Sequence, residues 1–67
     1  MSEQLEKYRN MNPSELETQQ RELAEQIFRL RFQLSSGQTE GLKRLREARK
    51  DLARVKTLLR EAELRKA

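Results

Sequence analysis

The chain has 67 residues, with 15 Lys or Arg against 11 Asp or Glu, and its net charge at neutral pH is therefore +4. Charged residues make up 39% of the sequence, and the pI is about 10.0. This balance favours a polyanionic partner, most often nucleic acid. The chain contains no Cys and no His, which excludes disulfides, zinc sites built from those two residue types and histidine-based catalysis.

Apolar residues never occur more than two in a row, and the first four residues do not begin a hydrophobic signal segment. We therefore expect no membrane-spanning helix, no membrane partner and a cytoplasmic location. The acidic residues are spread among Lys and Arg rather than gathered where a pocket could shift a carboxyl pKa. Because a Gly-rich phosphate loop is also missing, we expect a protein without enzymatic activity, cofactor, metal site or small-molecule substrate.

The first eleven residues carry Leu5, Tyr8 and Met11 at three-residue spacing. This spacing predicts a short N-terminal helix or turn whose apolar side covers the open end of the remaining structure. A frayed N-terminal tail is the alternative interpretation.

The residues around Pro13 read as the start of a long helix. Asn12 can cap the free N–H groups, Pro13 suits the first helical position, and Glu15 can reach back to the cap. The composition then predicts a helix over residues 13–36, closed by Gly37 in a left-handed conformation. Its seam advances by alternating steps of four and three residues and contains Leu16, Gln20, Leu23, Ile27, Leu30 and Leu34.

A turn at residues 37–39 precedes a second predicted helix at residues 40–65. Thr39 is its predicted N-cap, with Glu40 in the first turn. Gly41 is unfavourable near this start by about 1 kcal/mol relative to Ala. The seam of this helix alternates steps of three and four and contains Leu45, Ala48, Leu52, Val55, Leu59 and Ala62.

Each predicted helix has an apolar seam only one stripe wide, which an isolated helix cannot bury. The short connection around Gly37 allows the helices to fold back on each other. We therefore predict an all-α single domain over residues 1–67, a long antiparallel two-helix hairpin preceded by the short segment 1–11. A homodimeric coiled-coil scaffold, with the seams paired between two chains, is the rival interpretation.

The charge is concentrated in the second half of the chain. Residues 1–36 carry five basic and six acidic residues, net −1, whereas residues 37–67 carry ten and five, net +5. On a helical wheel of about 100° per residue, five cations of the second helix fall on one side of its seam, with no acid among them between residues 46 and 60. These are Arg46, Arg49, Lys50, Lys56 and Arg60, with Ala53 and Thr57 in between. Such a stripe can lie along a phosphate backbone, although a solvated helix face has the same composition.

Two Phe residues, Phe28 and Phe32, fall outside the seam of the first helix and alternate with Arg29 and Arg31. They could pack on ribose or unstacked bases. We favour the structural interpretation, in which the rings cover the side of the hairpin or receive the N-terminal segment.

Three stretches make the chain resemble the family of bacterial large-subunit ribosomal protein L twenty-nine. They are EQIFRLRFQ at 25–33, SGQ at 36–38 and RKDLARVKT at 49–57, in the order and at the distances that this family shows. The resemblance extends from about residue 8 to residue 61. The sequence departs from the family pattern at Arg29, where Asn is customary, at Thr39, where Leu is customary, and over the first dozen residues.

The resemblance implies an antiparallel helical hairpin that lies on large-subunit ribosomal RNA at the rim of the polypeptide exit tunnel. It also implies large-subunit protein L twenty-three as a neighbour, in a region that receives trigger factor and the signal recognition particle. Arg31, Gln33, Arg49, Arg54 and Thr57 occupy matching motif positions. Together with the charge pattern, these positions give the RNA-binding candidates: Arg29, Arg31, Gln33, Lys43, Arg46, Arg49, Lys50, Arg54, Lys56, Thr57 and Arg60.

A general basic helical adaptor for DNA or anionic lipid is a third hypothesis. No basic region runs into an extended zipper, as a helical DNA reader of that kind requires. Lipid binding would also call for larger apolar side chains than Ala48 and Val55 provide.

Overall fold

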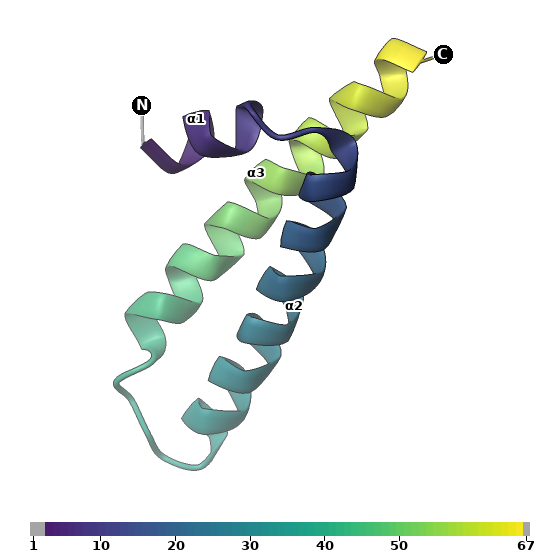
Figure 1. The fold of residues 1–67 in the computed structure, drawn as a ribbon. Helices are drawn as coiled ribbons and strands as arrows, with labels where there is room; N and C mark the ends of the chain where they lie inside the picture. Colours follow the sequence, from purple (N-terminus) through teal and green to yellow (C-terminus); the bar gives the residue numbers. More distant parts are fainter. Residues whose placement is uncertain (1–2, 67) are drawn as a thin grey trace.

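The computed structural model describes the backbone of residues 3–66 and the side chains of residues 6–65. Its elements are α1 (Glu3–Arg9), α2 (Pro13–Ser35) and α3 (Leu42–Lys66). Helices α2 and α3 run antiparallel side by side, and α1 crosses against α3 near the open end of this hairpin (Figure 1). The predicted all-α hairpin with a short N-terminal helix is confirmed, and its dimensions are 45 × 22 × 14 Å. Over residues 3–66, no helix is both long enough and apolar enough to cross a membrane.

Helix α2 begins with the capping arrangement that the sequence predicts. The Glu15 backbone N–H donates to Asn12 Oδ1 at 2.8 Å, and the Asn12 backbone N–H donates to Glu15 Oε1 at 3.3 Å. Pro13 occupies the first turn, where its missing N–H leaves no hydrogen bond unmade. Two of the free N–H groups at this end are therefore satisfied within the chain.

The C-terminal end of α2 is closed by Gly37, as predicted. Gly37 has φ +94°, a backbone conformation that residues with a Cβ adopt only with strain. Its N–H donates to the Leu34 carbonyl at 3.1 Å, and the next N–H, that of Gln38, donates to the Gln33 carbonyl at 3.2 Å. This pair of bonds is a Schellman motif, and it uses carbonyls that the helix end would otherwise leave free.

Helix α3 begins later than predicted. The connection extends to Gly41, so the predicted helix start at residue 40 and the N-cap at Thr39 are wrong. Instead, the Leu42 N–H donates to the Thr39 carbonyl in a tight turn, and the first α-helical bond joins the Leu45 N–H to the Gly41 carbonyl at 2.8 Å. Gly41 is buried so closely against α2 that a Cβ there would lie 3.0 Å from Leu30 Cδ2. Its weak helix propensity and this close approach together place the helix start after the glycine.

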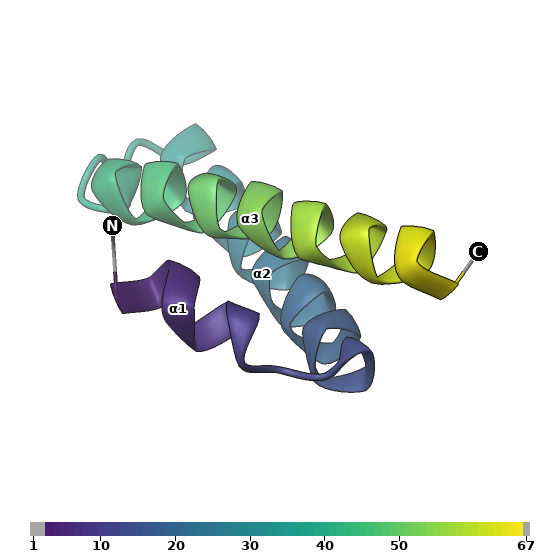
Figure 2. The ribbon, with the colours of Figure 1, turned by 90° about the horizontal axis from the view of Figure 1, so that it is seen from above.

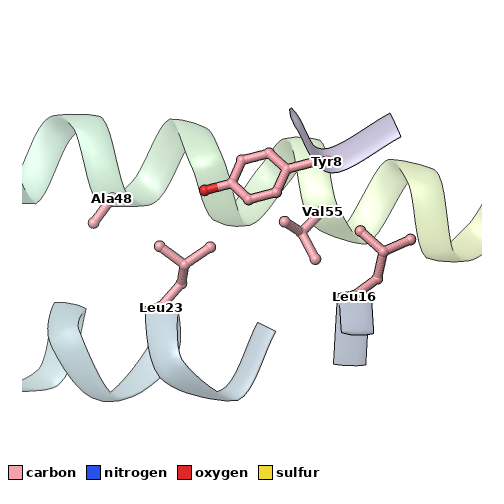
Figure 3. Packing of buried hydrophobic residues seen from close by; sticks show 5 residues of the cluster. All are labelled: Tyr8, Leu16, Leu23, Ala48 and Val55. Carbon is pink, nitrogen blue, oxygen red and sulfur yellow. The ribbon is translucent and has the colours of Figure 1, made fainter. Parts of the chain in front are cut away.

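The core lies between the two long helices and is covered at one side by α1. Its central members are Leu16 and Leu23 of α2, Ala48 and Val55 of α3, and Tyr8 of α1, with Val55 fully buried. Figure 3 shows Leu23 pointing between Ala48 and Val55, with the Tyr8 ring above them. The predicted seams therefore face each other within one chain.

The buried side of α3 is wider than its predicted seam because α1 packs against it. Asp51 is buried with only 6% of its surface exposed, and Arg54 Nη1 donates to its Oδ1 at 3.0 Å. Burial raises the pKa of Tyr8 above its usual value of 10.0, and the negative charge of nearby Asp51 raises this pKa further. Tyr8 and half-buried Met11 belong to this packing, whereas the side chain of Leu5 lies outside the described residues.

Candidate nucleic-acid interface

One side of α3 carries a row of exposed cations, which we call the basic flank. Helical periodicity aligns these residues along α3. Helix α1 lies along one side of α3 (Figure 2), where Tyr8 is close to Asp51 and half-buried Leu58 packs against the core. All members of the basic flank are exposed: Arg46, Arg49, Lys50, Lys56 and Arg60, with the smaller Ala53 and Thr57 between them.

The charges of the basic flank are not neutralised within the described part of the chain. The ion pairs among side chains 6–65 join Arg29 to Glu25 at 3.9 Å and Arg54 to Asp51 at 3.0 Å, and neither involves the basic flank. Solvated cations on a helix face attract phosphates over a distance of about one Debye length. The flank can therefore bind a polyanion without first breaking internal ion pairs.

The middle of the basic flank is shallow enough for a close approach. A groove of about 250 Å³ is lined by Arg49, Leu52, Ala53 and Lys56 of α3 and by Ile27 of α2. The Thr57 hydroxyl donates to the Ala53 carbonyl at 2.9 Å, so its proton is used within the helix. A phosphate strand following this groove would meet the cations Arg49 and Lys56 and the small side chain of Ala53.

Acidic residues mark the end of the basic flank near the open end of the hairpin. Glu17 of α2 and Glu63 of α3 border one hollow together with Lys56 and Arg60. Towards the connection, Lys43 is exposed in the first turn of α3 and extends the positive charge. The most positive surface therefore lies between the connection and the middle of α3.

The remaining candidates do not all join this surface. Exposed Arg31 lies on the side of α2 that borders the groove, because it shares a hollow with Ile27. Arg54 is half-buried and paired with Asp51, and Arg29 is paired with Glu25. Gln33 lies close to Gly41, because a Cβ added to Gly41 would be 3.7 Å from Gln33 Oε1. The structure thus places Arg31 near Ile27, which also lines the groove, and leaves Arg29, Gln33 and Arg54 outside the basic flank.

The structural interpretation of the two Phe residues is wrong. Phe28 is 73% exposed and Phe32 is 68% exposed, so neither ring covers the side of the hairpin. The N-terminal segment packs against α3 instead, with Tyr8 beside Asp51. The sequence contained one indication of this docking. Leu58 lies next to the narrow seam of α3 and widens the apolar side of that helix towards Asp51.

The fold and the charge distribution define a small basic helical protein with one exposed cationic face. The profile described as "Ribosomal L29 protein" matches residues 6–61. The relative from Acidobacterium capsulatum, named "Large ribosomal subunit protein uL29", is 52% identical over 58 residues, which cover 87% of this chain and 64% of the relative. A relative of the same name from Solibacter usitatus is 54% identical over 56 residues, covering 84% of each chain.

A further relative of this name, from Natranaerobius thermophilus, is 55% identical over 84% of this chain and 86% of its own length. The chain therefore belongs to the Ribosomal L29 protein family, a structural, non-enzymatic family of the large ribosomal subunit. This confirms the resemblance carried by the three sequence stretches. No solved structure matches this chain.

Proposed function

We propose that this protein is a structural constituent of the large ribosomal subunit that binds ribosomal RNA through the basic flank of α3. It supports translation on the cytoplasmic ribosome near the polypeptide exit tunnel. Large-subunit protein L twenty-three is its protein neighbour, and trigger factor or the signal recognition particle meets this region from outside. The observation that supports RNA binding most directly is the exposed row of cations, without internal ion pairs, on the face that α1 and α2 leave open.

The geometry of the flank suits a phosphate backbone. From Arg46 to Arg60 it extends about 21 Å, at about 1.5 Å per helical residue. A rigid helix holds these cations at fixed spacing, so little conformational entropy beyond that of the side chains is lost when they contact phosphates. Each neutralised phosphate releases condensed counterions, which supplies affinity and makes it depend on salt. The flank therefore positions the protein on RNA, whereas base reading requires other groups.

The test replaces four cations of the flank with Gln in the full chain: Arg46, Arg49, Lys56 and Arg60. A charge-matched control replaces four exposed Arg residues elsewhere: Arg9, Arg21, Arg44 and Arg65. Both variants lose four positive charges, so a difference between them reports position rather than net charge. Binding to large-subunit RNA fragments is measured across a salt series, and helicity is checked by circular dichroism.

The flank variant should bind RNA more weakly, and the slope of log K against log salt should fall by about three, since each lost phosphate contact removes roughly 0.7–0.9 from it. The control variant should retain most of the slope. Equal losses in the two variants, or an unchanged slope in the flank variant, would contradict the assignment of the RNA contact to this face.

A further inference from the structure

The proposed contact with phosphates leaves one surface of α2 unexplained. Phe28 and Phe32 border a hollow of about 460 Å³ whose other walls are Ala24, Ile27 and Arg31. The two Phe residues keep 73% and 68% of their surface exposed. Leaving large aromatic side chains in water forgoes most of the favourable free energy that their burial would provide. Two such rings one helical turn apart, at an exposed hollow, are typical of a surface that a partner covers.

This hollow is cationic as well as aromatic. Exposed Arg31 lies in the same wall as the two rings, and its guanidinium forms no ion pair among the side chains of residues 6–65. The acidic side chain nearby in sequence, that of Glu25, is directed to Arg29 at 3.9 Å. Guanidinium planes and aromatic rings both present flat faces to which bases can stack.

The hollow shares one lining residue with the groove at the basic flank. Ile27 of α2 lines the hollow and also lines the groove beside Arg49 and Lys56 of α3. At Ile27, the aromatic hollow of α2 therefore adjoins the groove beside Arg49 and Lys56 of the antiparallel helix α3. A ligand that covers both must carry negative charge along one edge and flat apolar faces along the other.

We propose that Phe28, Arg31 and Phe32 form a platform for unpaired nucleobases of an RNA whose phosphates lie along the basic flank of α3. This inference rests on the proposed function for the phosphate half of the contact. Aromatic rings beside a positive track are the general arrangement for holding single-stranded nucleic acid. An apolar helix of a protein partner fits less well, because it would bury the Arg31 guanidinium without a partner charge.

The experiment compares RNA hairpins that have an unpaired loop or bulge with a perfect duplex of the same length and charge. A double variant, Phe28→Leu with Phe32→Leu, keeps apolar volume but removes the aromatic faces. A second double variant, Phe28→Tyr with Phe32→Tyr, keeps the faces. Leu64→Ala serves as a control, because Leu64 is also 68% exposed and lies near the far end of α3. Thermal melts check that the exposed substitutions leave the fold intact.

Stacking of a base on an aromatic side chain corresponds to roughly a fivefold or larger change in affinity. The Leu variant should therefore bind the unpaired RNAs about fivefold more weakly or worse and the duplex less than twofold more weakly, with an unchanged salt slope. The Tyr variant and the Leu64→Ala control should bind as the parent protein does. A fluorescent base analogue in the loop should be quenched by the parent and the Tyr variant, and not by the Leu variant.

Several results would overturn the platform. Equal affinity of the Leu variant and the parent for unpaired RNA would do so, as would an equal loss on unpaired and duplex RNA. Unchanged RNA affinity with reduced retention on large subunits would assign the rings to a neighbouring protein instead. The basic-flank variant separates the two proposals. If it keeps its salt slope while the Leu variant loses its preference for unpaired RNA, the proposed phosphate contact is contradicted and the platform is not.

Discussion

Truncation of Leu23 to Ala tests how the hairpin is held together. Leu23 is 7% exposed and points from the middle of α2 between Ala48 and Val55 of α3, beneath the Tyr8 ring (Figure 3). It therefore contacts side chains of both other helices. Removing its three outer carbon atoms weakens the packing of α3 and α1 at the same time.

The expected loss is about 3 kcal/mol. Three carbons at about 0.8 kcal/mol each give about 2.4 kcal/mol for transfer to water, and a cavity that relaxes only in part adds to this. A domain of this size has a total unfolding free energy of about 3–10 kcal/mol, so the variant loses a third or more of its stability. At about 4–8 °C per kcal/mol, the melting temperature should fall by about 12–24 °C.

Thermal and urea unfolding followed by circular dichroism measure this loss. Leu64→Ala is the matched control, because it removes the same atoms from a side chain that is 68% exposed. The control should change the unfolding free energy by less than about 0.5 kcal/mol. Half-buried Leu52 should give an intermediate loss when it is truncated to Ala. Equal melting temperatures for Leu23→Ala and Leu64→Ala would show that the packing described here is wrong.

Three other predictions concern α1 and the helix ends. Tyr8 is the only tyrosine, so ultraviolet absorbance should show a pKa above 10, raised first by burial and then by Asp51. The unfolding free energy should be constant below about pH 10 and should fall as the pH rises through the folded-state pKa of Tyr8. Tyr8→Phe should abolish the part of this fall that is due to the phenol. Gly37→Ala should reduce the unfolding free energy by about 1–2 kcal/mol, purely through the positive φ, because nothing lies within 4 Å of the added Cβ. Asn12→Ala should reduce it by about 1 kcal/mol in urea titrations, through loss of the cap.

Features that depend on neighbours in the chain were predictable. The capping box at Asn12 and the left-handed Gly37 each involve residues no more than five positions apart, so the residue types are sufficient to identify them. The same holds for the two seams, since a helix brings residues three and four apart onto one face. The start of α3 was missed because it depends on how closely Gly41 approaches Leu30 across the hairpin.

The candidate interface was predictable only in part, for the same reason. Helical periodicity aligns the cations of α3, but it cannot say which of them pair with acids or become half-buried, as Arg54 does beside Asp51. Nor can it say whether Phe28 and Phe32 meet α1 or remain in water. Both outcomes depend on where the N-terminal helix docks.

Residue order and local geometry were thus sufficient for two long helices, their caps, their facing seams and a one-sided row of positive charge. The docking of α1 required contacts between residues more than forty positions apart, in which the Tyr8 ring fits beside Asp51 and the seam of α3. Such contacts form only if shape and polarity match across the assembled hairpin, which no local pattern encodes. This docking fills one side of α3 and leaves the cations of the basic flank exposed to solvent.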